Sequence, residues 1–189
     1  MAQNVFILSA QRTPVGSFQG QLANQSAPQL GATAIKAALE KARIPAQDVN
    51  ECIMGQVLTA GAGQAPARQA ALYAGLPQSV PCMTINKVCG SGLKAVMLAS
   101  DSIALGHSTV AVAGGQENMS LAPHLLENSR SGYRMGHVQV SDSMIKDGLW
   151  DPYSNFHMGN AAEICVKDYK VTREAQDEFA KESYMRAQK

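Results

Sequence analysis

The chain has 189 residues, of which 46% are hydrophobic and 16% are charged, and its formal net charge is +1. This balance is typical of a globular protein with a sizeable core, and the even spread of charge favours neither nucleic acid nor an anionic membrane as a partner. The apolar stretches are far shorter than a membrane span, so we expect no membrane insertion. The opening segment MAQNVFILSAQRTP lacks the positive n-region of a signal peptide, which makes a cytoplasmic location the expectation.

The N-terminal part predicts strands that alternate with helices. Val5–Leu8 is a short β-type run and is expected to form a first strand. Ser26 is a favourable N-cap, and Pro28 stands just inside the helix that follows it. Ile44-Pro45 ends this helix, and Val49–Leu58 is expected to be the second strand.

A glycine-rich loop and another helix come next. The loop Gly61–Gln64 lacks the lysine and the Ser/Thr of a P-loop and also the full dinucleotide fingerprint. We interpret it as a turn, with ligand binding as the alternative. The helix predicted over residues 66–74 ends at Gly75.

The stretch Val80–Gly115 organises the rest of the prediction. It indicates a strand at Met83–Val88, a turn with glycines that carries Cys89, a helical pattern that ends at Gly106, and a strand at Thr109–Ala113. Strands that alternate with helices in this way favour an α/β fold with a mainly parallel sheet.

Cys89 is the candidate nucleophile because of its place at a strand-to-helix turn. The unpaired amides of the first helical turn and the positive end of the helix dipole favour thiolate over thiol, and thiolate is the nucleophilic form. Gly90 and Gly92 would let a substrate carbonyl approach the backbone closely. The alternative is that Cys89 is a small buried hydrophobe, which is the usual state of a free cysteine.

The other cysteines and the histidines form no metal-binding pattern. Cys52 and Cys165 are expected to pack in a strand and a helix, and Cys82 is expected in the core, although it could border the same site as Cys89. No C-x-x-C, H-x-x-x-H or H-E-x-x-H spacing occurs. We therefore expect no metal.

After the central stretch the periodic pattern is lost and then returns. Residues 116–152 form a long segment with little periodicity, which is usually functional in a compact fold. Within it, Arg130–Val140 is either an exposed hairpin or a mobile surface loop. A helix is expected to open at His157, and the last helix begins after its N-cap Thr172.

Three blocks, in this order, resemble the thiolase family. They are NKVCGSGLKAV at residues 86–96, VAGGQENMS at residues 112–120 and HMGNAAE at residues 157–163. The acetoacetyl-CoA (biosynthetic) thiolases are the most similar branch, and the resemblance runs along the whole chain. It implies one half of the layered thiolase fold, with an N-terminal core domain at residues 1–118 and part of a loop domain at residues 119–189.

The resemblance also implies a reaction and a set of site residues. Cys89 would be the acyl-accepting nucleophile, and His157, Met158 and Leu149 would line the acyl-CoA pocket, with the methionine narrowing it toward short acyl groups. The reaction implied is condensation of two acetyl-CoA to acetoacetyl-CoA, or the reverse thiolysis, within fatty acid metabolism. No cofactor beyond the coenzyme A thioester substrate is implied. The implied assembly is a homotetramer, built as a dimer of dimers.

The family pattern is only partly present. Thiolases use a histidine in a G-H-P segment, an asparagine and a second cysteine in a C-x-G segment, and neither G-H-P nor C-x-G occurs in this sequence. The expectation is therefore an N-terminal portion that is inactive by itself. Two alternatives stay open, a degradative 3-ketoacyl-CoA thiolase and a non-catalytic thiolase-like module that binds acyl-CoA or pairs with another subunit.

Overall fold

The computed structural model describes residues 4–189. Contacts within the chain divide it into two compact units, with the boundary between Gly148 and Leu149. The domain division predicted at residues 118/119 stays a prediction, because contacts within this chain do not test it. Across the described residues, none of the helices has both the length and the apolar character that crossing a membrane requires.

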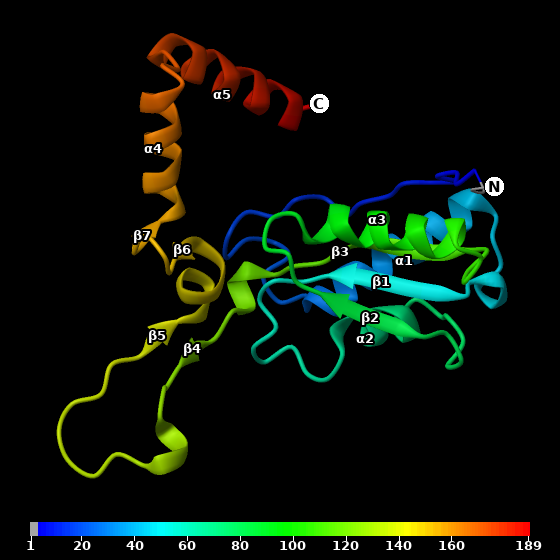
Figure 1. Cartoon of the computed structure of the whole chain (residues 1–189), viewed down its shortest axis with the longest axis horizontal. Coiled ribbons are helices and arrows are strands. Elements are labelled where there is room, and N and C mark those ends of the chain that lie inside the picture. Colours follow the sequence, from blue (N-terminus) through cyan, green and yellow to red (C-terminus); the bar gives the residue numbers. More distant parts are fainter. Residues whose placement is uncertain (1–3) are drawn as a thin grey trace. The chain divides into compact units, whose positions relative to one another are not determined.

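A three-stranded parallel sheet forms the centre of the first unit (Figure 1). Strand β1 (Glu51–Gly55) lies in the middle, with β2 (Cys82–Ile85) on one side and β3 (Ala111–Gly115) on the other. Cys52 is in register with Cys82 of β2 and with Val112 of β3. The prediction of an α/β fold with a parallel sheet is confirmed.

Helices pack against both faces of this sheet. Helices α1 (Ala27–Ala42) and α2 (Pro66–Tyr73) cover one face, and α3 (Ser91–Ala104) covers the other. Successive side chains of β1 point to opposite faces, so Cys52 and Met54 join the α1/α2 core whereas Ile53 packs with α3. Full burial of one such apolar side chain contributes about 1.5–3 kcal/mol to stability.

The predicted start of the first helix is confirmed in detail. The hydroxyl of Ser26 accepts a hydrogen bond from the backbone N–H of Gln29 (3.3 Å), and the Gln29 side chain accepts one from the N–H of Ser26 (2.8 Å). This reciprocal capping box satisfies two amides that have no partner inside the helix. Arg43 ends the helix in a left-handed conformation.

The prediction of a strand at Val5–Leu8 is wrong. This segment is irregular, and Phe6, Ile7 and Leu8 expose 74%, 79% and 62% of their surface. The physical reason is that this run pairs with no strand. The positions beside β1 are filled by β2 and by β3, which pairs with it from Glu51 with Ala111 to Gly55 with Gly115, and the run does not extend the sheet at its outer edges. Without a neighbour to share backbone hydrogen bonds, a β-type run does not form a strand.

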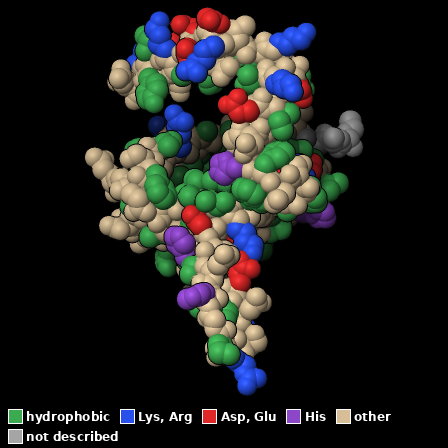
Figure 2. All heavy atoms as spheres, turned by 90° about the vertical axis from the view of Figure 1, so that its left-hand side faces the viewer, with side chains coloured by type: hydrophobic (Ala, Val, Ile, Leu, Met, Phe, Trp, Pro, Cys, Tyr) green, Lys and Arg blue, Asp and Glu red, His purple; other side chains and the backbone are tan. Residues whose placement is uncertain are grey.

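The segment after β3 consists of short elements. It contains the 3-10 turns η2 (Met119–Leu121) and η3 (Ser129–Ser131), the strands β4 (His124–Leu125) and β5 (Ser141–Asp142), and the π-helical turn η4 (Met144–Leu149). β4 and β5 pair antiparallel and form the base of a long arm, which is a narrow projection at the bottom of Figure 2. Residues 130–140 lie exposed in this arm.

The second unit is mainly helical. A small antiparallel pair of β6 (Trp150–Asp151) and β7 (Phe156–His157) leads into α4 (Met158–Asp168), and α5 (Arg173–Ala187) follows. The hydroxyl of Thr172 accepts from the N–H of Ala175 at 3.2 Å, which confirms it as the N-cap. The one element of the described chain not yet named, the 3-10 turn η1 (Ala46–Asp48), belongs to the first unit and lies between α1 and β1.

Candidate functional site

Cys89 lies in the turn that joins β2 to α3, as the sequence predicts. The strand ends at Ile85, and α3 begins at Ser91 with Gly90 as its N-cap. The thiol of Cys89 is exposed, so the alternative of a small buried hydrophobe is wrong for this chain. No side chain caps the first turn of α3, which leaves this end of the helix open to a ligand.

The start of α3 lies very close to the ends of two strands. A Cβ atom added to Gly55 of β1 would lie 2.6 Å from Cβ of Ser91 and 2.9 Å from the backbone N of Gly92. A Cβ atom added to Gly115 of β3 would lie 3.4 Å from Cα of Gly92. Glycine at these positions therefore permits the approach that brings the Cys89 turn to the carboxyl ends of β1 and β3.

Cys52 and Cys82 lie in neighbouring strands and belong to the α1/α2 core. Cys52 is fully buried, and burial raises the pKa of its thiol from 9.0 to about 12. Burial also raises the pKa of Cys82, although the nearby Arg68 opposes this. Cys82 packs against the α1/α2 core, as predicted. This core lies on the face of the sheet opposite α3.

Cys165 differs from its prediction. It lies in α4, as expected, but its side chain is exposed and does not pack in a core. Only contacts decide whether an apolar position of a helix becomes buried, and no residue of α4 is buried in this chain.

Glu117 and Asn118 form hydrogen bonds with loops at the carboxyl ends of the strands, a role that the sequence does not indicate. The Glu117 carboxylate accepts from the backbone N–H groups of Val57 (2.8 Å) and Leu58 (3.1 Å). Its partial burial raises its pKa, and these two hydrogen bonds oppose the rise. Nδ2 of Asn118 lies within hydrogen-bond distance of three carbonyls of the N-terminal loop, those of Leu22, Ala23 and Gln25, so its two hydrogens are shared among them.

A buried pair of glutamines lies beside this connection. Gln116 donates through Nε2 to Oε1 of Gln56 (2.9 Å), and Gln56 donates through Nε2 to the carbonyl of Leu58 (2.9 Å). Oε1 of Gln116 is buried without a hydrogen-bond partner and faces Gly31 of α1. In the sequence, the local sign of this cluster is the polar run after β3. Gln56 lies 60 positions before Gln116, so the sequence does not indicate that the two residues pair.

The three predicted pocket residues lie together in the second unit. His157 pairs with Trp150 across the β6–β7 ladder, so Leu149 and Met158 stand at the same end of this small hairpin. Nδ1 of His157 accepts from the N–H of Gly159 (2.9 Å), which makes the residue the N-cap of α4. A neutral His157 therefore carries its proton on Nε2. Cys89 belongs to the first unit.

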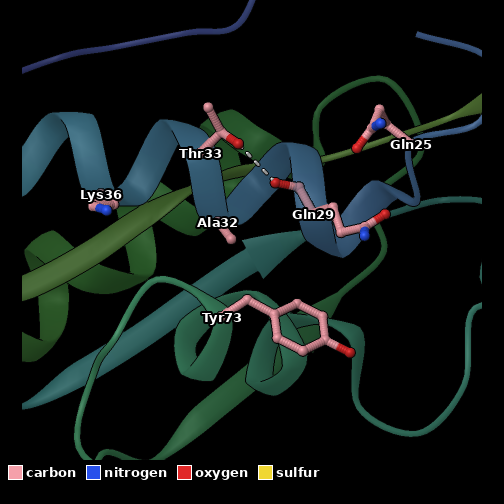
Figure 3. Close-up of a pocket in the computed structure, with 6 residues that line it drawn as sticks. All are labelled: Gln25, Gln29, Ala32, Thr33, Lys36 and Tyr73. Carbon is pink, nitrogen blue, oxygen red and sulfur yellow. Dashed lines mark hydrogen bonds between the residues drawn. The ribbon is translucent and has the colours of Figure 1, made fainter.

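Two hollows occur in the first unit, apart from the Cys89 turn. One, of about 350 Å³, is lined by Gln25, by one side of α1 and by Tyr73 of α2, as Figure 3 shows. The other, of about 470 Å³, is mostly apolar and lies between residues 13–18 and the segment 117–120. Within residues 4–189 the His, Cys, Asp and Glu side chains form no group of three that could hold a metal ion.

Comparison with known proteins gives a consistent result. The family model "Thiolase, N-terminal domain" matches residues 5–189. The chain is 62% identical to an acetyl-CoA acetyltransferase of Cupriavidus necator over 98% of this chain and 47% of that protein. It is 57% identical to an acetyl-CoA acetyltransferase of Pseudomonas aeruginosa and 50% identical to a probable one of Escherichia coli, with the same coverage in both cases. The chain thus spans about half the length of the curated relatives it matches.

Proposed function

Because this chain belongs to the thiolase family, we propose that it carries the nucleophile of an acetyl-CoA acetyltransferase. The single observation that carries this proposal is the placement of Cys89. It is an exposed thiol on the strand-to-helix turn before α3, whereas Cys52 and Cys82 are held in the α1/α2 core. Acyl transfer to a cysteine needs a sulfur atom that a thioester can reach, and the exposed position of Cys89 supports this access.

The first half of the reaction transfers an acetyl group to Cys89. The thiolate attacks the carbonyl carbon of acetyl-CoA, so a new carbon–sulfur bond forms and the bond to the sulfur of coenzyme A breaks. Coenzyme A leaves and takes up a proton, and the acetyl group remains on Cys89 as a thioester. The open N-terminus of α3 offers backbone donors where negative charge develops on the carbonyl oxygen.

The second half forms the carbon–carbon bond. A second acetyl-CoA loses a methyl proton to a base, and its carbanion attacks the acetyl carbon. The Cys89 thiolate then leaves, and acetoacetyl-CoA is the product. The family's G-H-P and C-x-G segments, which supply the base and the acid/base cysteine, do not occur in this sequence. The residues of this chain therefore support the acyl-transfer half reaction. We propose that no metal or cofactor takes part.

We propose that Leu149, His157 and Met158 line the acyl-CoA pocket. Support comes from the β6–β7 ladder, in which His157 is the partner of Trp150, so that the three residues are close to one another along the backbone at one end of a hairpin. The Nε2–H group of His157 is a donor that the capping interaction through Nδ1 leaves free for a ligand. Met158 is 38% exposed, so its flexible side chain is accessible to an acyl group.

We also propose that the protein is a cytoplasmic homo-oligomer, organised as a dimer of dimers. Apolar side chains gather on the β2 edge, the Cys89 turn and α3, where Met83, Val88, Leu93 and Met97 are 44–70% exposed. Surfaces of this kind often mark subunit contacts. Size-exclusion chromatography with light scattering on the full-length gene product tests the assembly.

All four cysteines are free, which suits a reducing compartment such as the cytoplasm.

The central experiment is peptide mass spectrometry after incubation with acetyl-CoA. We expect one acetyl group on Cys89, removable by free coenzyme A, and none in Cys89→Ser. Cys165→Ser is the matched control, because it removes the other exposed thiol and should leave the adduct intact. The full-length product of the gene is used. The absence of an acetyl group on Cys89 in that protein would contradict the proposal.

Chain-length profiling separates this function from that of a degradative 3-ketoacyl-CoA thiolase. Thiolysis of acetoacetyl-CoA should exceed that of long-chain 3-ketoacyl-CoA substrates. Met158→Ala should enlarge the proposed pocket and improve the use of longer chains relative to acetoacetyl-CoA. Equal use of both classes by the unmodified protein would favour the degradative enzyme.

A further inference from the structure

The residue before Cys89 has a strained backbone. Val88 has a φ of 46°, in the left-handed region. A β-branched residue rarely adopts this conformation, because its Cβ substituents crowd the backbone. Strained residues of this kind persist only where several interactions hold them, and they are concentrated at functional sites. The groups that hold Val88 therefore bear on the orientation of Cys89.

Two side chains form hydrogen bonds with the backbone of Val88, one from a residue before Cys89 and one from a residue after it. Oδ1 of Asn86 accepts from the N–H of Val88 at 2.8 Å. The hydroxyl of Ser91 donates to the carbonyl of Val88 at 2.6 Å and accepts from the N–H of Lys87 at 2.8 Å. Both backbone polar groups of Val88 are thus bound by side chains, one from each side of Cys89 in the sequence.

Ser91 is itself held in place by the sheet. It is only 5% exposed, and it lies against Gly55 of β1, where an added Cβ would approach its own Cβ to 2.6 Å. Its hydroxyl therefore has little freedom to move away from the turn. Ser91 thus packs against the end of β1 and, through its hydroxyl, is hydrogen-bonded to the turn that carries the exposed Cys89.

We propose that Asn86 and Ser91 are positioning residues for Cys89. By holding Val88 in the left-handed conformation, they present the Cys89 thiol at the N-terminus of α3 in one orientation instead of many. Attack on a thioester benefits because reacting groups held in a productive geometry need not be ordered during the reaction. This inference rests on the proposed function, in which Cys89 is the nucleophile.

The test measures alkylation of Cys89 by iodoacetamide in the chain as it exists. Peptide mass spectrometry gives the rate at Cys89 and, in the same sample, at Cys165, the exposed cysteine of α4 that serves as an internal reference. We expect Ser91→Ala and Asn86→Ala each to lower the Cys89:Cys165 rate ratio at least threefold.

Val88→Gly separates positioning from stability. Glycine adopts a positive φ without strain, so the urea midpoint should stay the same or rise. The rate ratio should nevertheless fall, because a flexible turn no longer holds one orientation of Cys89. A residue with a merely structural role would not lower reactivity while stability is kept.

Ser102→Ala is the matched control. Ser102 also lies in α3 and its hydroxyl is hydrogen-bonded, to Ser108 at 2.9 Å, but it is remote from the turn. Its removal should leave the rate ratio unchanged. If Ser91→Ala does not fold, Asn86→Ala and Val88→Gly decide the question.

Unchanged ratios in Asn86→Ala and Val88→Gly would overturn the inference. Failure of the proposed function gives a different result, since the alkylation ratio would respond to Ser91 while acetyl-CoA left no acetyl group on Cys89. The two failures are therefore distinguishable.

Discussion

The two faces of the central sheet are filled by side chains of different size. On the α1/α2 face, large and medium apolar side chains such as Met54, Ile35 and Leu76 form an extended buried cluster. On the α3 face, the buried cluster of the described residues consists of Ile53, Ala95 and Ala99, and glycines let the helix approach the strands. One face thus provides most of the core, whereas the other places a turn with an exposed cysteine at the ends of the strands.

The largest expected contrast between the two faces is in cysteine reactivity. At neutral pH, a pKa of about 12 instead of 9.0 leaves Cys52 with about a thousandth of the thiolate of an ordinary cysteine. Burial blocks access to it as well. In alkylation of the native chain we expect Cys89 to react and Cys52 to remain unmodified, and unfolding in urea should abolish this difference. Similar rates at both cysteines in the native chain would show that the α1/α2 core opens readily.

The next effect contrasts two glycines in neighbouring strands. Gly55→Ala would place a methyl group against the backbone of Ser91, which cannot move without shifting α3, and should cost about 3 kcal/mol of unfolding free energy. Gly114→Ala on the opposite face meets only the side chain of Met54, at 3.6 Å, and should cost less than about 1 kcal/mol. Urea denaturation measures both, and equal losses would contradict the close approach of α3.

A smaller effect is expected where α1 meets the buried glutamines. A Cβ at Gly31 would overlap Oε1 of Gln116, so Gly31→Ala should cost about 1–2 kcal/mol. With Gln116→Ala in the same chain, the methyl group has room, and the two losses should fall short of additivity by about 1 kcal/mol. A double-mutant cycle from urea denaturation gives the coupling. Strict additivity would mean that the two residues do not touch.

The smallest effect concerns Glu117, at the strand ends where the two faces meet. Burial raises its folded-state pKa above the ordinary value of 4.5, so the folded protein binds more protons than the unfolded chain in this range. The contribution of Glu117 to stability is thus complete below pH 4.5 and is lost as the pH rises through the folded-state pKa. The urea midpoint of the unmodified chain should fall relative to that of Glu117→Gln between pH 4 and pH 7. A relative rise over this range would show that hydrogen bonds from Val57 and Leu58 outweigh burial.

The sequence by itself determined the local features of this protein. Two N-caps, Ser26 and Thr172, are where their side-chain oxygens predict them. The turn at Cys89 is where the glycines that follow it predict a turn. Each depends on hydrogen bonds or backbone preferences within a few residues, which are readable from the residues concerned. The family resemblance likewise rests on short contiguous blocks.

Only the tertiary structure decided which segments meet. An apolar run at Val5–Leu8 has the composition of a strand, yet β1 and β3 pair directly and leave it exposed. Gln56 and Gln116 are hydrogen-bonded although they are sixty positions apart in the sequence. Cys52 is buried and Cys165 is exposed although both are cysteines in regular secondary structure. Strand order, long-range hydrogen bonds and burial depend on contacts between distant segments, and local composition specifies none of these contacts.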